Sequence, residues 1–324
     1  MTAWLLRRSV AALVTVLAVV TLVFFAIHLA PGRPFLPGGD RPLDPAVEAG
    51  LRARFGLDRP LLVQYADYLA ALSRGDLGES FSQQRAVRTA LADAIPNTLV
   101  LAGTALAIDF LLGTLLGVAM AAQAGRRTDR ALGGVTLVVY ALPTFWLGLV
   151  LLLVFGQWLR WFPVGGVTDP VVYGALPFAG RVLDRLHHLA LPALSLGLVG
   201  AAGTARFQRA ALLEALHQGF VRTARAGGLS ERRVLLHALR NALLPSITLL
   251  GLALPFLLTG SVVVETVFSW PGMGKLAADA IGSRDYPLVM AATIVAALLV
   301  VGGSLAADVL YAAADPRIRP WKEA

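Results

Sequence analysis

The sequence predicts an all-α protein, a polytopic transmembrane helical bundle of about six spans with a small helical external subdomain. Of its 324 residues, 57% are hydrophobic and 15% are charged, whereas about half of a soluble domain is apolar and about a quarter is charged. The net charge of +8 does not indicate a nucleic-acid partner, because the basic residues lie in the gaps between long apolar runs.

The apolar runs set the expected number of spans. A helix needs about 20 apolar residues to cross a bilayer core of about 30 Å. Six runs are long enough, and they cover 9–30, 97–122, 131–156, 188–209, 242–267 and 287–312. The fourth is the weakest, since Pro192 and several glycines interrupt it. The first exceeds the roughly 7–15 residues of a signal-peptide core, so we interpret it as a retained span.

These spans imply four regions. Residues 1–30 contain a cytoplasmic N-terminus and the first span, and residues 31–96 form an external loop with a helical subdomain. Residues 97–312 form a five-span transmembrane core with a cytoplasmic segment at 210–241, and residues 313–324 form a cytoplasmic tail. Prolines and glycines open the external segment, and apolar residues then recur at helical spacing from Pro45 to Leu72.

Orientation follows from the basic residues, which accumulate on the cytoplasmic side of membrane proteins. With a cytoplasmic N-terminus, fifteen basic residues fall inside and five fall in the two short outside loops. The inside set comprises Arg7, Arg8, Arg126, Arg127, Arg130, the seven arginines from Arg206 to Arg240, Arg317, Arg319 and Lys322. This asymmetry predicts that both termini are cytoplasmic.

No catalytic or metal-binding pattern stands out. The chain has no cysteine, and the adjacent pair His187 and His188 would point in different directions on a helix, which makes a poor metal chelate. Lys275 follows a glycine as in a phosphate-binding loop, but Ser269 and Leu276 replace the first glycine and the final hydroxyl residue of that motif. We therefore expect no catalytic residue, no metal site and no cofactor in this chain.

Three acids lie in or near the spans. Asp109 is the deepest, and it either lines a transport pathway or bonds a neighbouring helix. Glu265 and Asp308 lie near span ends, where solvation is cheaper.

The segment between the fourth and fifth spans is too polar to cross a membrane and too patterned for a plain linker. Phe220, Thr223 and Ala224 can share one helical face, Gly227-Gly228 ends that helix, and Ser230 can cap a second one. Two short helices around a glycine break form a docking knob for a partner; the alternative is a solvated basic loop in contact with lipid headgroups.

At this segment the chain resembles the membrane subunits of ATP-binding-cassette importers of the dipeptide/oligopeptide/nickel branch. The resemblance rests on motifs spread along almost the whole chain, and they are 55–60, 74–81, 143–152, 222–230, 237–245, 264–274, 284–288 and 315–317. It assigns ATPase coupling to Phe220, Arg222, Thr223, Ala224, Arg225, Ala226, Gly228, Leu229 and Ser230. It assigns an external signature loop to Glu265, Phe268, Trp270, Pro271, Gly272 and Gly274.

The resemblance implies a type I importer permease fold in a bacterial plasma (inner) membrane. It further implies a heterodimer with a second related permease, two cytoplasmic ATPase subunits that bind ATP and Mg²⁺, and an external solute-binding protein. The chain would form half of the pathway for di- or oligopeptides and would not itself be an enzyme. The alternatives are a self-sufficient ion-coupled carrier or channel, and a membrane enzyme, for which the acids are too scattered.

The chain also departs from the family pattern. The stretch from Gly228 to Pro245 is one residue shorter than is usual, and one residue turns a helix by about 100°, which would rotate the docking face. Gly219 and Gly227 stand where an acid and a lysine are common, and Arg33 stands where an aspartate is usual.

Overall fold

The computed structural model describes residues 2–30, 44–258 and 262–314. Within these ranges the regular elements are helices, accompanied by one isolated bridge between Glu79 and Ala86. The α-helices are α1 Thr2–Leu29, α2 Pro45–Arg54, α3 Leu61–Ser73, α4 Val87–Ala122, α5 Arg127–Ala141, α6 Thr144–Leu151, α7 Phe178–His217, α8 Gly219–Ala226, α9 Glu231–Leu258, α10 Val262–Val267, α11 Met273–Gly282 and α12 Tyr286–Ala314. A π-helix, η1 Leu152–Trp158, continues α6, and a 3₁₀ turn, η2 Tyr173–Ala175, precedes α7. The predicted all-α class is confirmed.

Four described helices are long and apolar enough to cross a membrane: α1, α4, α7 and α12. The pair formed by α5 and α6–η1 adds a fifth crossing if it counts as one span. The expected span 242–267 covers the end of α9, all of α10 and residues 259–261, which lie outside the described residues, so it stays a prediction. The motif at 315–317 and the tail beyond Ala314 also lie outside them, whereas residues 313 and 314 of the predicted tail belong to α12.

The third apolar run is broken where a continuous helix was expected over 131–156. Helix α5 ends at Ala141, Leu142 and Pro143 are extended, and α6 leaves at an angle of 103° to α5. A proline disfavours the helical conformation in the residue before it, so the break falls at Leu142. In contrast, Pro192 lies inside α7 without ending it, and the fourth run is part of one long helix.

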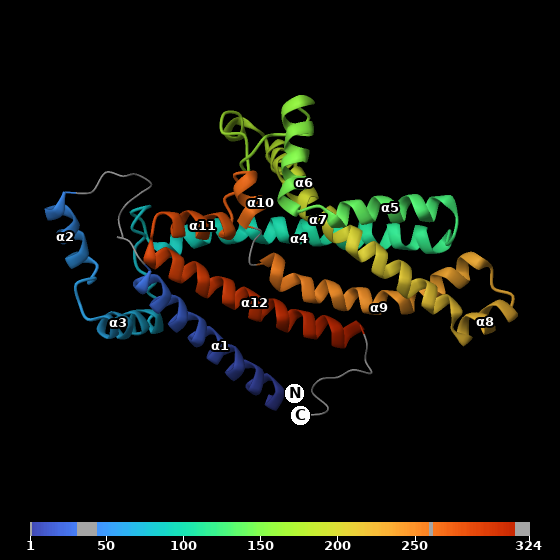
Figure 1. Cartoon of the computed structure of the whole chain (residues 1–324), viewed down its shortest axis with the longest axis horizontal. Helices are drawn as coiled ribbons and strands as arrows, with labels where there is room; N and C mark the ends of the chain where they lie inside the picture. Colours follow the sequence, from blue (N-terminus) through green and yellow to red (C-terminus); the bar gives the residue numbers. More distant parts are fainter. Residues whose placement is uncertain (1, 31–43, 259–261, 315–324) are drawn as a thin grey trace.

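The bundle is centred on the contact between α4 and α7, where glycines bring the two backbones together (Figure 1). A Cβ added to Gly113 would lie 2.7 Å from the Cβ of Thr204, and one added to Gly117 would lie 2.7 Å from the carbonyl oxygen of Ala205. On α7, a Cβ on Gly197 would lie 2.7 Å from the Cβ of Ile108. Small residues at such positions allow close van der Waals packing between membrane helices.

The other long helices pack around this pair. Helix α9 contacts α4, α7 and α12, and α12 also contacts α1. At one end of the bundle, α3 packs its aromatic residues Tyr65 and Tyr68 against Phe24 of α1. Helix α8 lies at the opposite end (Figure 1). The helical segment predicted between Pro45 and Leu72 and the polar segment after the fourth span are therefore far apart.

We expect Gly113→Leu to destabilise the protein through the α4–α7 contact. The added side chain meets backbone as well as side-chain atoms, and overpacking of this kind costs about 1–3 kcal/mol. Gly103→Leu is the matched control on the same helix, because a Cβ there meets no atom within 4 Å. Thermal unfolding in detergent should show a lower midpoint for Gly113→Leu alone, and equal midpoints would contradict the packing argument.

Candidate functional site

The first candidate feature is the turn from α7 through α8 into α9, residues 218–231, which we call the α8 elbow. Val221 is 0% exposed and anchors α8 in a cluster of buried apolar residues. The cluster draws its other members from the end of α4, the end of α7 and the start of α9, and they are Ala121, Leu212, Ala215, Val234, Ala238 and Ala242. Three long helices therefore fix the position of this short one.

The end of α8 is a Schellman turn around Gly228. The N–H of Gly228 donates to the carbonyl of Arg225 at 3.0 Å, and that of Leu229 donates to the carbonyl of Ala224 at 3.2 Å. Gly228 has φ +78°, a left-handed conformation in which a Cβ costs energy. The carbonyl of Ser230 then accepts the first hydrogen bonds of α9, so the predicted glycine break and second helix are both present.

An ion pair closes the elbow. Nε and Nη2 of Arg225 donate to the two carboxylate oxygens of Glu231 at 2.9 and 3.1 Å. These hydrogen bonds hold the pKa of Glu231 below its ordinary value, so the carboxylate is ionised at neutral pH. The pair joins the last turn of α8 to the first turn of α9, and Arg225 is engaged within the chain.

The residues assigned to ATPase coupling fall into two groups, one partly buried and one exposed. Phe220 and Ala224 are partly buried in the anchoring cluster, whereas Thr223, which was expected on their face, is exposed. The remaining coupling residues, Arg222, Arg225, Ala226, Gly228, Leu229 and Ser230, are also exposed. The anchor Val221 was missed, although its apolar side chain beside Phe220 in a polar segment was the available signal.

We predict that Gly228→Ala loosens the elbow and that Gly227→Ala does not. A Cβ in the left-handed region costs about 1–2 kcal/mol, whereas Gly227 has an ordinary φ of −76° and room for a Cβ in normal contact. Hydrogen exchange of the α8 amides should be faster in Gly228→Ala only. Equal exchange rates in the two variants would contradict the role given to Gly228.

The second candidate feature is a buried hydrogen-bonded loop, the Glu265 knot, formed by residues 264–275 together with Asn97 and Thr98 of α4. Glu265 is 0% exposed. Its carboxylate accepts hydrogen bonds from the hydroxyl of Thr98 at 3.0 Å and from the N–H of Lys275 at 2.8 Å. The Thr98 oxygen also accepts from the N–H of Met273 at 2.7 Å. A network that satisfies a buried carboxylate in this way fixes the loop on α4.

The two glycines of the knot are required for space. A Cβ on Gly272 would lie 2.5 Å from a carboxylate oxygen of Glu265, and one on Gly274 would lie 2.9 Å both from that carboxylate and from the backbone of Val262. Neither glycine has a positive φ, so close approach to the carboxylate, and not backbone conformation, explains them.

The aromatic residues of the knot connect it to the bundle. The indole N–H of Trp270 donates to the carbonyl of Asn97 at 3.0 Å, and the side-chain amide of Asn97 donates to the carbonyl of Pro271 at 3.0 Å. Trp270 packs with Leu101 of α4 and Leu189 of α7, while Phe268 packs with Leu191. The six residues assigned to the signature loop are therefore brought together as a structural unit.

The expectation that Glu265 is solvated near a span end is wrong, because the loop folds over its carboxylate. Lys275 contributes its backbone N–H to this network, and its ammonium group pairs with Asp279 at 2.7 Å. Asp308, the other acid expected there, lies in α12, where the structure does not describe its side chain.

Asp109 lies on the α4–α7 contact. Its carboxylate accepts a hydrogen bond from the hydroxyl of Thr204 at 2.6 Å and packs against Gly200. Of the two roles considered, bonding to a neighbouring helix is the one that this contact supports. Four residues along α7, Gln208 hydrogen-bonds Ser246 of α9 inside the bundle, which ties a third helix to the pair.

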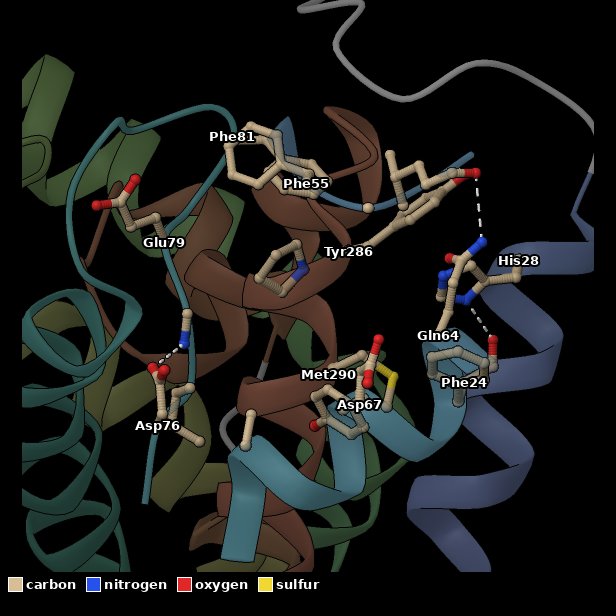
Figure 2. A pocket seen from close by; sticks show the side chains of 17 residues that line it. Phe24, His28, Phe55, Gln64, Asp67, Asp76, Glu79, Phe81, Tyr286 and Met290 are labelled. Atoms are coloured by element: carbon tan, nitrogen blue, oxygen red, sulfur yellow. Dashed lines mark hydrogen bonds between the residues drawn. The ribbon is translucent and has the colours of Figure 1, made fainter. Parts of the chain in front are cut away.

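A second buried acid, Asp285, joins two motifs that are far apart in the sequence. Its carboxylate accepts hydrogen bonds from the hydroxyls of Ser80 and Ser82 and from the N–H of Ser82. The ring centroids of Phe55 and Phe81 lie 4.4 Å apart with the rings tilted by 54°, and Tyr286 lies next to them (Figure 2). These aromatic rings border a cavity of about 280 Å³ between α1, α3 and α12. Because Ser80 and Ser82 belong to the segment between α3 and α4, their hydrogen bonds to Asp285 hold that segment to the start of α12.

Within the described ranges, no group of three metal-ligating side chains is close enough to hold an ion. His187 bonds the carbonyl of Trp161 at 2.6 Å and His188 bonds that of Asp184 at 2.9 Å. The histidine pair is thus occupied by separate backbone partners.

Gly272→Ala should destabilise the Glu265 knot, because its methyl group would meet the carboxylate at an impossible distance. Leaving a buried hydrogen-bonding group unsatisfied costs about 1–3 kcal/mol. Gly282→Ala in α11 is the control, since its Cβ would face open space. The unfolding midpoint in detergent should fall for Gly272→Ala only; a fall of the same size in Gly282→Ala would refute the explanation.

The described helices form a membrane-type helical bundle with an exposed, seated elbow. Residues 113–320 match the family described as the binding-protein-dependent transport system inner membrane component, and residues 1–102 match its N-terminal family. The chain belongs to this family and is a permease subunit, not an enzyme. Such transport systems include partner components, among them ATPases and a binding protein.

Relatives that the chain matches over almost their whole length are also named as transport permeases. The chain is 39% identical to the oligopeptide transport system permease protein AppB of Bacillus subtilis, over 98% of this chain and 99% of that protein. It is 41% identical to the di/tripeptide transport system permease protein DppB of Pseudomonas aeruginosa, with the same coverage. It is 38% identical to the glutathione transport system permease protein GsiC of Salmonella typhimurium, over 98% of each chain.

Proposed function

We propose that this permease imports di- or oligopeptides as one of two related subunits that together enclose the pathway. The support is that its relatives with matching length transport oligopeptides, di- and tripeptides or glutathione according to their names. These cargoes share a peptide backbone. In this assembly two ATPase subunits would bind ATP and Mg²⁺, and an external binding protein would deliver the peptide.

The observation that carries the proposal is the α8 elbow. Val221 anchors this short helix against three long helices. A force on α8 would therefore be transmitted to the bundle, whereas a force on a mobile loop would only move the loop. Its outward face carries Arg222, Thr223 and Ala226, a combination of small and basic residues that suits docking in a cleft of an ATPase. The alternative role, contact of α8 with lipid headgroups, would not require α8 to be anchored in the bundle.

The proposed orientation places α8 and both termini in the cytoplasm of a bacterium and the α2–α3 subdomain outside. The excess of basic residues in the inside segments supports it. The separation of α8 from α2 and α3 at opposite ends of the bundle agrees with it (Figure 1).

The mechanism that follows is alternating access by rigid-body movement. ATP shifts the ATPase pair toward its closed state only because it binds that state more tightly. The docked elbows then move with the ATPases, and the bundles rock between inward-open and outward-open arrangements. The α4–α7 contact carries the movement away from the elbow.

Ala226→Glu tests the docking face directly. Ala226 is exposed and is neither in the anchoring cluster nor in the left-handed turn, so the variant should fold normally. A charge that is buried without a partner in an interface costs roughly 2–5 kcal/mol, which weakens ATPase association more than about tenfold. Co-purification of the ATPase subunits and peptide uptake should both fall.

Ala92→Glu is the control, since Ala92 is an exposed helical alanine near the opposite end of α4. It should retain ATPase association. Normal uptake by Ala226→Glu, or peptide transport by this chain alone in liposomes, would refute the proposal and would favour a self-sufficient carrier.

A further inference from the structure

A second cavity lies between α4, α5 and α7, at the same end of the bundle as α8. It has a volume of about 360 Å³ and its walls are Met120, Asp129, Arg130, Gly133, Arg206 and Arg209. We call it the arginine cavity. Met120 adjoins Ala121 of the cluster that anchors α8, so the cavity borders the seat of the elbow.

The charges in the cavity do not balance. Asp129 is 5% exposed and accepts two hydrogen bonds from Arg209, at 2.7 and 2.8 Å, and a third from the N–H of Gly125 at 2.9 Å. Its negative charge is therefore matched by Arg209. Arg130 and Arg206 pair with no carboxylate in the part of the chain that the structure describes. Two exposed guanidinium groups are left facing one space.

Gly133 keeps this space open. A Cβ built on it meets no atom within 4 Å, so any side chain at this position would project into the cavity without a clash. Because Gly133 carries no side chain, its backbone forms this part of the cavity wall.

The chemistry of the walls selects a phosphate. Guanidinium groups bind phosphate oxygens through paired, charge-assisted hydrogen bonds, and Arg206 is held in place over the ring of Tyr140 at 5.8 Å. Basic pockets between membrane helices are typical sites for anionic lipid headgroups.

The surface next to the cavity favours a lipid over a soluble anion. Leu137 and Tyr140 follow Gly133 on the same face of α5, at i+4 and i+7, and are 51% and 55% exposed. They form an apolar track that begins at the cavity and runs along the apolar half of the helix. A phosphate between the arginines would place an acyl chain on this track.

We propose that the arginine cavity binds the phosphate of an anionic phospholipid, whose acyl chain lies along Leu137 and Tyr140. The bound lipid holds α4, α5 and α7 together beside the elbow. Assignment to the cytoplasmic leaflet rests on the proposed orientation, but recognition of the phosphate does not.

Native mass spectrometry of the full-length chain in detergent tests this site. Phosphatidylglycerol should bind more tightly than phosphatidylcholine, whose choline group cancels the charge. Gly133→Leu should abolish the bound phosphatidylglycerol, while Gly134→Leu, whose Cβ also faces open space but which does not line the cavity, should bind it normally. Arg206→Gln and Arg130→Gln should each weaken binding about fivefold, since an arginine near an anionic lipid contributes about 1 kcal/mol.

Two results would overturn the proposal. One is unchanged phosphatidylglycerol binding in Gly133→Leu and in Arg206→Gln, provided that circular dichroism shows both variants folded. The other is displacement of the lipid by inorganic phosphate at millimolar concentration, which would make the cavity a site for a soluble anion. Both readouts are independent of peptide uptake, so they separate this proposal from the proposed function.

Discussion

The close contact between α4 and α7 is the constraint on which the other features depend. Glycines at Gly113, Gly117 and Gly197 let the backbones meet, and the two helices then run together from one candidate feature to the other. Near one end they carry Thr98 and Leu189, which hold the Glu265 knot. Near the other end they carry Ala121 and Leu212, which seat α8. A displacement of the elbow therefore reaches the knot through packed backbone.

Buried acids fix the loops and connections between the helices. Glu265 orders the loop between α10 and α11, and Asp285 joins the α3–α4 connection to the start of α12. Asp129 ties the α4–α5 turn to Arg209 of α7. Glu265 and Asp285 accept hydrogen bonds from backbone and hydroxyl donors of other segments, whereas Asp129 accepts from the guanidinium of Arg209 and from the nearby N–H of Gly125. In all three cases the hydrogen bonds of the carboxyl group fix a loop, which is a structural use of the costly burial of an acid.

The helical class and the approximate positions of the long helices could be predicted from the sequence, because an apolar run of about 20 residues has few other interpretations. The end of α8 at Gly227-Gly228 was also predictable, because a glycine that ends a helix acts through the conformation of its own backbone and not through distant contacts. The division of the elbow into an inward and an outward face was not, because Val221 and Phe220 are drawn inward by residues from three other helices. Pro143 was a local signal for the break at Leu142, but the length of the apolar run 131–156 led to the prediction of one continuous helix.

The buried position of Glu265 illustrates why the remaining features escaped prediction. Nothing near it in the sequence supplies its partner Thr98, which lies 167 positions earlier. The same holds for Asp285 with Ser80 and Ser82, although both motifs had been recognised separately. Contacts between distant segments depend on the packed fold. The motifs that contain these residues could therefore be recognised in the sequence, but the contacts between them could not be predicted.

The central claim is that α8 and the α4–α7 pair move as one rigid body. The chain has no cysteine, so Gln218→Cys and Ala92→Cys provide two unique positions for spin labels; Gln218 is exposed at the start of α8 and lies outside the proposed docking face. Pulsed electron paramagnetic resonance on the chain assembled with its ATPase subunits would measure the distance between them with and without a non-hydrolysable ATP analogue. The account predicts the same distance distribution in both states, whereas a distance that changes with nucleotide would contradict rigid transmission from the elbow.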